Sequence, residues 1–181
     1  ETLVYTDEQG RRIDMGSIPL GGAVFSAGEG LSVRRHANGE LLIESTDGLY
    51  RLFEPTPGDP SRLRLGRLGD RNDNRIHLDY DEAARLVRLR DTFDLTRIEL
   101  VYDERWPQRI SRIERLYADQ RRDVLMHYGY DVQGDLAQVR QSNGRVKRRY
   151  AYDAGRRMVE HKLPTGLRCV YEWALIEDRE W

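Results

Sequence analysis

The sequence is poor in cysteine and in long apolar runs. Cys169 is the single cysteine among 181 residues, so no internal disulfide can form and nothing indicates folding in an oxidising compartment. No apolar stretch approaches the roughly 18–20 residues of a membrane span, and Glu1 to Tyr5 lack the features of a signal peptide. Cytosolic synthesis is therefore favoured. The absence of an initiator methionine fits a fragment of a longer protein.

Clustered metal ligands are also lacking. The histidines, His36, His77, His127 and His161, lie far apart, and none has the spacing of a zinc site. Residues 70–74 are rich in Asp and Asn but lack the loop and closing glutamate of a calcium site, so a turn is expected there. His77 shares a predicted strand face with Asp79 and Asp81, and it forms the one local constellation. We expect neither a metal nor a cofactor.

No arrangement for nucleophilic catalysis is present. The Gly-x-Ser-x-Gly elbow is absent, and Cys169 falls in a predicted strand, where it is expected as a small buried residue rather than an activated thiolate. The glycine-rich segment Gly16–Gly22 lacks the lysine of a phosphate loop and is expected to be an irregular link. We assign no catalytic residue and expect that this chain is not an enzyme.

Charge is abundant but nearly balanced. Charged residues make up 34% of the sequence and apolar residues 39%, which favours an extended sheet with one solvated face. Residues 1–60 hold 5 arginines and 10 acids, whereas residues 61–181 hold 25 arginines or lysines and 21 acids. In the second part the signs alternate along predicted strands, as in cross-strand ion pairs. Nucleic-acid binding is not expected, because no basic stripe with stacking aromatics stands out.

The most informative pattern is a tyrosine–aspartate pair that recurs along the chain. The pairs are Tyr80-Asp81, Tyr102-Asp103, Tyr130-Asp131 and Tyr152-Asp153. Two of the intervals between them are 22 residues, and a fixed period of roughly 20–50 residues indicates a repeat architecture. In three units an apolar residue follows the tyrosine by six positions. Each unit is therefore expected to be a strand, a tight turn and a returning strand.

Residue chemistry explains the pair without a catalytic role. Tyrosine buries a large ring at the end of a strand while its hydroxyl reaches a partner. Aspartate starts a turn because its carboxylate accepts hydrogen bonds from backbone N–H groups two residues on. The apolar residue then resumes the sheet. The residues that we interpret as defining the repeat structurally are Tyr80, Asp81, Leu86, Tyr102, Asp103, Tyr130, Asp131, Gly134, Leu136, Tyr152, Asp153 and Met158.

Period-two alternation and turn dipeptides predict an all-β, antiparallel meander. Ile76, Leu78 and Tyr80 alternate with polar residues, and Asn38-Gly39 and Asn143-Gly144 are typical of hairpin turns. Strands are expected at 2–6, 11–15, 31–36, 40–45, 49–54, 75–81, 85–90, 96–102, 109–116, 124–131, 136–141, 145–152, 157–163 and 167–173.

Two segments depart from this pattern. Residues 55–60, with three prolines, are expected to form an irregular connection, because proline removes ladder donors and disfavours helix. This connection divides a pre-repeat β region, residues 1–60, from a repeat array, residues 61–181. In residues 108–120, apolar residues fall at helical spacing, so this segment is either a short helix or, as its place in the array favours, a strand.

The units resemble the YD repeat, approximately Tyr-Asp-x-x-Gly-Arg-Leu, of rearrangement hotspot (Rhs) proteins. Residues 80–86 and 130–136 carry the motif, residues 166–173 resemble the way such units close, and residues 38–55 resemble the strands before the repeats. The resemblance covers residues 31–175. The departures are Ala84 in place of the glycine, Gly155 one place early, and a unit at Tyr102 that runs into Trp106-Pro107.

The resemblance implies part of a large β-shell, or cocoon, that encapsulates a carboxy-terminal toxin of the same protein. Bacterial members are polymorphic toxins of interbacterial competition, made in the cytoplasm and often secreted by type VI secretion. The implied partners are the remaining shell strands, the toxin, and a secretion spike or chaperone. Bacterial members self-cleave near an Asp-Pro motif after the repeats, but Asp59-Pro60 lies before the array, so no catalytic residue is carried over.

The leading functional hypothesis is thus a non-catalytic segment of a shell. The alternative is a β-sheet binding module for glycans or for a chaperone or delivery protein, with aromatics at Tyr50, Trp106, Tyr128, Trp173 and Trp181. An enzyme in its own right is the third possibility. An open sheet leaves its edges unpaired, so the isolated chain is expected to need neighbouring shell strands or a partner to stay soluble.

Overall fold

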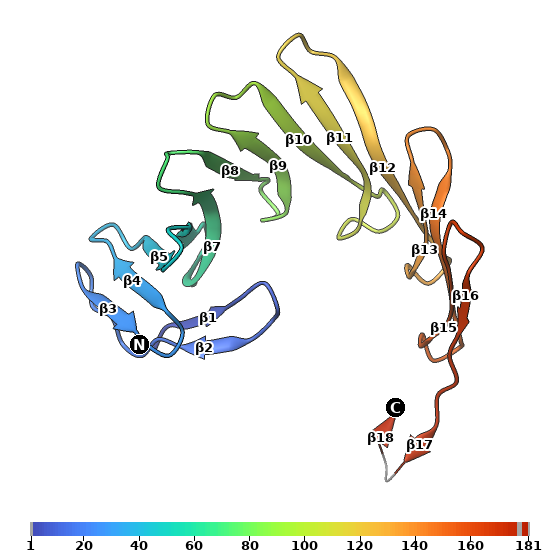
Figure 1. The fold of residues 1–181 in the computed structure, drawn as a ribbon, viewed down its shortest axis with the longest axis horizontal. Helices are drawn as coiled ribbons and strands as arrows, with labels where there is room; N and C mark the ends of the chain where they lie inside the picture. The colour runs from blue at the N-terminus through green and yellow to red at the C-terminus, as the bar shows by residue number, and fades with distance from the viewer. Residues whose placement is uncertain (1, 177–178, 181) are drawn as a thin grey trace. The chain divides into compact units, whose positions relative to one another are not determined.

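The computed structural model describes residues 2–176, 179 and 180, and in this range it contains strands and turns. The chain divides into two compact units, Glu1–Leu95 and Thr96–Trp181, whose elements can be followed in Figure 1. Within each unit, the strands of the main sheet pair antiparallel with their neighbours in sequence, which confirms the predicted all-β meander. The described residues include no helix long and apolar enough to cross a membrane.

Unit 1 consists of a hairpin and a meander. The hairpin pairs β1 (Val4–Thr6) with β2 (Arg12–Asp14). The strands of the meander follow one another in sequence order: β3 (Ala23–Ser26), β4 (Leu31–Arg35), β5 (Leu41–Ser45), β6 (Tyr50–Thr56), β7 (Asp59–Gly69), β8 (Arg75–Tyr80) and β9 (Leu86–Asp91). Residues 16–22, between β2 and β3, form the irregular link that was expected.

The core of unit 1 lies between the hairpin and the meander. Val33 of β4 and Ile43 of β5 face each other in register and are fully buried. The Tyr5 ring of the hairpin meets Phe53 of β6 edge-on, with ring centroids 5.9 Å apart. The remaining buried members of this cluster are Met15, Ile18, Leu31 and Leu41. The hairpin therefore covers one face of the meander and supplies the second layer that a stable core needs.

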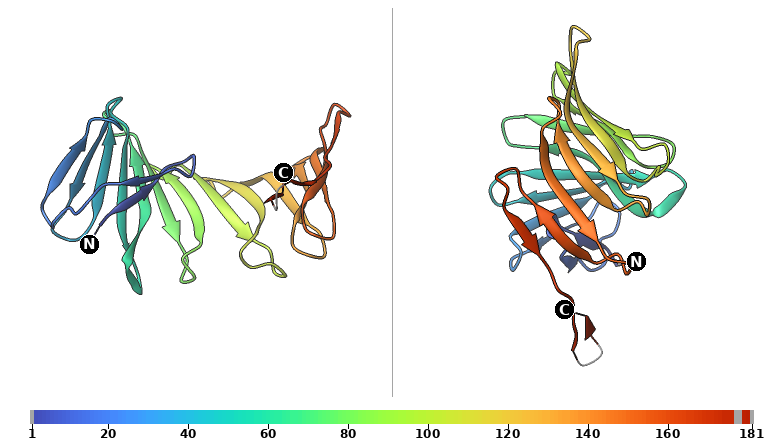
Figure 2. Two further views of the ribbon diagram at one scale, coloured as in Figure 1. Left: turned by 90° about the horizontal axis from the view of Figure 1, so that it is seen from below. Right: turned by 90° about the vertical axis from the view of Figure 1, so that its right-hand side faces the viewer.

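Unit 2 contains a second meander, shown from two sides in Figure 2. Its strands are β10 (Thr96–Tyr102), β11 (Ile110–Tyr117), β12 (Arg122–Tyr130), β13 (Leu136–Gln141), β14 (Val146–Tyr152), β15 (Met158–Lys162) and β16 (Arg168–Val170). A separate pair, β17 (Leu175–Ile176) and β18 (Arg179–Glu180), follows it. Each meander strand lies beside the strand that precedes it in the chain, so the pairing is local throughout the unit.

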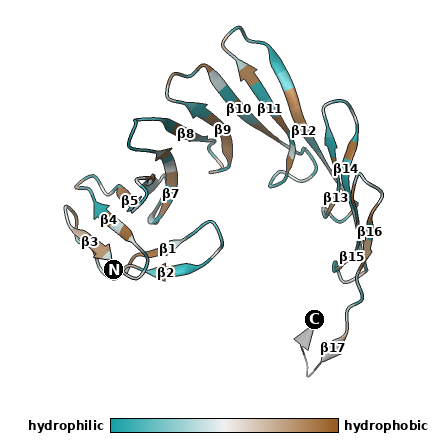
Figure 3. Ribbon diagram, in the orientation of Figure 1, coloured by the Kyte–Doolittle hydropathy of each residue, from teal (hydrophilic) through white to brown (hydrophobic). Residues whose placement is uncertain are grey.

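Alternation along the strands gives unit 2 two different faces. In one face, which we call the tyrosine face, Tyr130 lies opposite Leu136 and Tyr152 opposite Met158. In the other, the charged face, Glu99 lies directly opposite Glu114. Figure 3 shows hydrophobic and hydrophilic stretches alternating along strands of this unit. Among its described residues, the buried ones are Glu114, Leu116, Gly134 and Val139, so most of both faces is half exposed.

On the charged face, Arg122 bonds both Glu99 and Glu114 and so offsets the repulsion between them. Arg122 Nη1 donates to Glu99 Oε2 at 2.5 Å and to Glu114 Oε2 at 3.0 Å. Arg112 Nε donates to the other oxygen of Glu114 at 2.5 Å. The Arg112 hydrogen bond is the main reason why the pKa of Glu114 lies below its usual value. Cross-strand pairs of this kind replace the apolar packing that a covered face would have.

The structure decides one open alternative and corrects one expectation. Residues 110–117 form β11, so the strand reading of residues 108–120 is confirmed. The expected irregular connection at residues 55–60 is wrong, because β6 continues to Thr56, β7 begins at Asp59, and Pro55 pairs in register with Leu63. Four of the described strands, β3, β7, β17 and β18, were not predicted. The division of the chain at residue 60 into pre-repeat and repeat regions stays a prediction.

One five-residue turn recurs at the hairpin ends. In residues 81–85, the N–H of Asp81 donates to the carbonyl of Arg85, and the N–H of Ala84 donates to the carbonyl of Asp81. Residues 131–135, 153–157, 117–121 and 141–145 repeat both hydrogen bonds. This is a type I turn followed by a residue with positive φ. The fourth residues with their φ values are Ala84 (58°), Gly134 (82°), Arg156 (63°), Gln120 (66°) and Gly144 (80°).

Replacing Ala84 by glycine is predicted to stabilise the protein. A non-glycine residue at positive φ costs about 1–2 kcal/mol, and glycine loses about 0.5–1 kcal/mol more backbone entropy on folding. We expect Ala84→Gly to raise the free energy of unfolding by about 0.5–1 kcal/mol, measured by urea denaturation. Ala83→Gly is the matched control, because Ala83 has no positive φ, and it should destabilise. Equal effects of the two substitutions would contradict this explanation.

Candidate functional site: the tyrosine–aspartate turns

The aspartate of each repeated pair closes its own turn. Asp81 Oδ1 accepts from the N–H groups of Ala83 at 3.0 Å and Arg85 at 2.9 Å, while its Oδ2 accepts from Arg85 Nε at 2.8 Å. Asp131 accepts from the N–H groups of Gln133 and Asp135 at 2.8 and 2.9 Å. A carboxylate with two backbone donors holds the loop in one conformation.

The other two aspartates act in the same way. Asp153 accepts from the N–H and Nε of Arg157, at 3.0 and 2.9 Å. Asp103 accepts from the N–H groups of Arg105 and Trp106 in a loop that is two residues longer. The backbone hydrogen bond from the fifth turn residue is the largest cause that lowers the pKa of Asp81 and of Asp153. The carboxylates of Asp81 and Asp153 are therefore ionised hydrogen-bond acceptors rather than proton donors.

The tyrosine of the pair ties its strand to the preceding one. Tyr80 Oη donates to the carbonyl of Leu65 at 2.7 Å, Tyr130 Oη to that of Ile110 at 2.7 Å, and Tyr152 Oη to that of Leu136 at 3.0 Å. Burial raises the pKa of the Tyr130 and Tyr152 hydroxyls. The hydroxyl thus satisfies a main-chain acceptor across the sheet, and it is not a reactive group.

A β-bulge coincides with every repeated tyrosine. The register shifts between Asp79 and Tyr80, Val101 and Tyr102, Gly129 and Tyr130, and Ala151 and Tyr152. In each case the returning strand has one extra residue, and the tyrosine lies opposite an apolar partner. The partners are Leu86, Ile110, Leu136 and Met158. The structure therefore brings together the predicted repeat-defining residues of each unit.

Sequence reasoning missed Ile110 and the non-glycine residues at positive φ. Ile110 follows Tyr102 by eight positions rather than six, because the loop of that unit contains Trp106-Pro107. Gly155 was expected to be the turn glycine of its unit, displaced by one position. The positive φ instead belongs to Arg156, the fourth residue of the turn. Counting four residues from the aspartate, instead of searching for glycine, would have found this position.

Neighbouring turns of unit 2 contact one another along one rim. Arg105 Nη2 donates to the carbonyl of Val132 at 3.3 Å. The Trp106 indole lies on Gly134, where a Cβ would come within 2.9 Å of the ring. Arg156 then forms two hydrogen bonds with Asp135, at 2.9 and 2.5 Å. Each turn thus positions the next, and Gly134 is required both for its φ and for the space that Trp106 occupies.

Gly134→Ala is predicted to destabilise the protein more than Gly144→Ala. Both glycines have φ near 80°, but nothing lies within 4 Å of a Cβ at Gly144. Both variants pay the cost of positive φ, and only Gly134→Ala displaces the indole, which adds about 1–3 kcal/mol. Urea denaturation measures the difference. The excess should vanish in a Trp106→Ala background. An excess that persists there would show that Trp106 is not its cause.

Tyr130→Phe is predicted to cost about 0.5–1.5 kcal/mol of unfolding free energy, because the carbonyl of Ile110 loses its donor. Tyr128, on the same face of β12, is the control, since no hydrogen bond of its hydroxyl is present among the described residues. Tyr128→Phe should change the stability by less than about 0.5 kcal/mol. If both substitutions had the same effect in chemical denaturation, the hydroxyl would not connect the strands.

Groups that could support catalysis or metal binding do not assemble in the described part of the chain. No group of three or more His, Cys, Asp or Glu residues there could hold a metal ion. Asp79 is engaged by Arg90 and Asp81 by its own turn. Asp70 closes a turn, accepting from the N–H groups of Asn72 and Asn74, as expected. Cys169 is half buried opposite His161 in the strand register.

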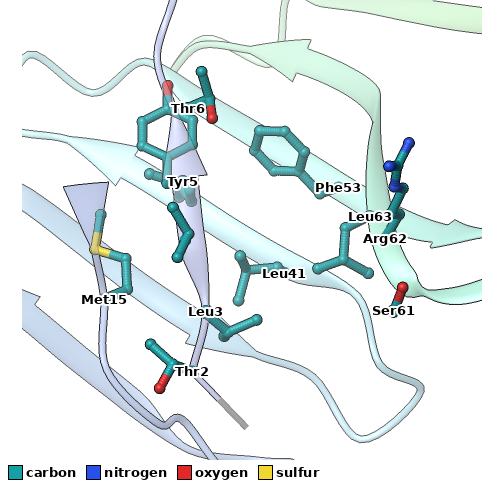
Figure 4. A pocket seen from close by; sticks show the side chains of 12 residues that line it. Thr2, Leu3, Tyr5, Thr6, Met15, Leu41, Phe53, Ser61, Arg62 and Leu63 are labelled. Atoms are coloured by element: carbon teal, nitrogen blue, oxygen red, sulfur yellow. The ribbon is translucent and has the colours of Figure 1, made fainter. Parts of the chain in front are cut away.

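Two pockets of unit 1 were examined as possible sites. One, of ≈ 390 Å³, lies beside the hairpin and is shown in Figure 4, where Tyr5, Leu41 and Phe53 form much of its wall. The other, of ≈ 560 Å³, is lined by apolar side chains such as Leu49, Ile76 and Phe93. Neither lining contains a nucleophile paired with a base. These two pockets therefore do not support a catalytic role.

The fold and the turns define a β-repeat protein with tyrosine–aspartate units, and comparison with known proteins identifies the repeat. Residues 130–168 match the family model described as RHS Repeat. A curated relative, the double-stranded DNA deaminase toxin A of Burkholderia cenocepacia strain H111, is 28% identical over 176 residues. The match spans 97% of this chain and only 12% of that relative. The resemblance to Rhs, or YD-repeat, proteins is thereby confirmed.

Two solved structures also match the chain. A crystal structure of TcdB2–TccC3–Cdc42 matches 82% of this chain with 16% identity and a TM-score of 0.48. A structure of the Photorhabdus luminescens Tc holotoxin pore with a TccC3 mutation matches 96% with 11% identity and a TM-score of 0.46. The chain spans 9% and 11% of those chains, respectively.

Proposed function

We propose that this chain is a non-catalytic wall segment of an Rhs-type shell that encapsulates a toxin of the same protein. The observation that carries the proposal is the repeated hairpin of unit 2. Its repeated features, which are the turn, the bulge and the hydrogen bond of the tyrosine hydroxyl, all serve to add one strand beside the last. A device of this kind builds an extended sheet, and it provides no reaction centre.

The exposure of unit 2 supports the same role. Few of its described side chains are buried, and β16 pairs with β15 alone among the described strands. A sheet with half-exposed faces and an open edge is suited to continuation by further strands. In this proposal the remaining strands of the shell pair with the open edges, and the toxin occupies the enclosed space. The deaminase toxin relative supports a toxin as cargo.

The route of delivery belongs to the proposal as well. We infer that the protein is made in the bacterial cytoplasm and exported for interbacterial competition, by type VI secretion with a spike or chaperone as partner. The division into a pre-repeat region, residues 1–60, and an array, residues 61–181, is part of this proposal. A binding module for glycans gains no support, because Trp106 packs on Gly134 and Tyr50 on Gly69. Trp181 lies outside the described residues.

An enclosing wall predicts that its two faces differ in access to large reagents. Cys169 lies in the tyrosine face, opposite His161, and serves as the probe of that face. For the charged face, the probe is Ala151→Cys in a Cys169→Ser background, since Ala151 is exposed and lies opposite Glu160. In the folded full-length protein, a maleimide carrying a long polyethylene glycol chain should label one probe rapidly and the other slowly.

Two controls make the labelling result interpretable. A small maleimide should reach both thiols, and both should react completely with the large reagent after unfolding in denaturant. The ratio of the two native labelling rates, measured by gel shift, is the readout. Equal rates with the large reagent in the native protein would rule out enclosure on either side of this segment.

A further inference from the structure

A row of cationic side chains crosses three strands on one face of unit 1. Arg67 of β7 lies directly opposite His77 of β8, and His77 lies directly opposite Arg90 of β9. We call these three residues the cationic row. Neighbouring strands are about 4.8 Å apart, so the two arginines lie close to the imidazole and would repel it once His77 is protonated. Arg75 and Arg88 follow the same alternation and flank the row.

Carboxylates neutralise this face only in part. Asp79 accepts from Arg90 at 2.7 and 2.9 Å and lies 4.0 Å from Arg88. Arg75 pairs with Asp73. Arg67 forms no ion pair with any carboxylate in the described part of the chain, and its Nε is buried without a hydrogen-bond partner. Asp94 contributes a further favourable charge at Arg90. Arg67 is therefore the arginine of this face to which the described residues supply no carboxylate.

The unpaired arginine is held in place by an aromatic ring. The Arg67 guanidinium lies 6.0 Å from the centroid of the Tyr50 ring. Tyr50 is directly opposite Gly69, and the ring occupies the space that a Cβ at Gly69 would fill. At this distance the ring provides a weak cation–π contact, which leaves the Nη donor groups of the guanidinium available to an acceptor.

The pKa of His77 reflects its burial and the positive charges of the cationic row. Burial is the largest cause that lowers the pKa of His77, followed by the positive charges of Arg90, Arg67 and Arg75. Asp79 acts in the opposite direction. The imidazole is therefore neutral at pH 7, and an anion placed on the row would favour its protonated form.

We propose that the cationic row binds an acidic polypeptide segment, whose Asp or Glu side chains supply the carboxylates that this face lacks. A polypeptide fits better than a nucleic acid for two reasons. Asp73 and Asp79 interrupt the positive surface, so separate carboxylates can dock where a continuous phosphate backbone would be repelled. The Tyr50 ring is engaged by Gly69 and Arg67, so it is not free to stack on a base. This inference does not rest on the shell role.

The test is binding of a labelled oligoglutamate peptide to the chain, tethered at low density through a biotin at its amino terminus. Arg67→Gln should weaken binding about tenfold, as expected for one charge-assisted hydrogen bond. Arg62→Gln is the matched control on the same strand, because the Arg62 side chain is 81% exposed and pairs with Asp59. Its affinity should stay within about twofold. Arg67→Lys, which retains the charge, should be intermediate.

Three outcomes would overturn the proposal. These are absence of peptide binding, equal losses for the Arg67 and Arg62 variants, and an oligothymidylate of the same charge that binds at least as tightly through Arg67. Circular dichroism checks that each variant is folded. Should Arg67→Gln fail to fold, the comparison of Arg67→Lys with Arg62→Lys decides in the same way.

The pH dependence gives a second readout that leaves Arg67 in place. Peptide binding should strengthen as the pH falls from 7.5 to 5.5, because His77 gains a proton beside the bound carboxylates while glutamate stays ionised. His77→Gln should bind with the affinity of the neutral form and lose this pH dependence. An unchanged pH dependence in His77→Gln would show that the peptide does not sit on the row.

Discussion

The structure depends on one local interaction, the carboxylate that accepts two backbone N–H groups of its own turn. Asp81, Asp131 and Asp153 each fix a loop whose first and fifth residues are paired. Closing the loop in this way sets the bulge beside the tyrosine and places an apolar residue opposite the ring. The tyrosine hydroxyl then reaches a carbonyl of the preceding strand. Turn, bulge and hydroxyl are therefore one unit rather than three separate features.

In such a repeat, the stability of each strand depends on the strands that pair with it. From β11 to β15, each strand pairs with the strands before and after it, as in repeat proteins whose stability is a sum of local and nearest-neighbour contributions. Unit 1 obtains more stabilisation from apolar burial among its own residues, because the β1–β2 hairpin covers Val33 and Ile43. Unit 2 relies on the contacts between its turns and on ion pairs such as those of Arg122.

Much of this could be predicted from the sequence, because the tyrosine–aspartate pairs, their apolar partners and the antiparallel order are recorded in residue spacing. Prediction from residue spacing failed where strand and turn patterns overlapped in the sequence. Around β7, the alternation of leucine and arginine from Leu63 onward predicts a strand, but the nearby prolines and glycines outweighed it. Ile110 was hidden by the longer loop at Trp106. The positive φ of Arg156 could not be read from composition, because position in the turn, not glycine, determines it. The approach of Arg67 to the Tyr50 ring depends on register between strands, which a single sequence does not give.

The central claim is that the repeat unit exists to add strands to a larger wall. The most direct measurement is the mass and melting behaviour of the isolated 181-residue chain, by light scattering coupled to size-exclusion chromatography and by calorimetry. The account predicts self-association through unpaired edges and a broad, weakly cooperative transition, both removed when the flanking strands are included. A monodisperse monomer that melts in one cooperative transition would contradict it.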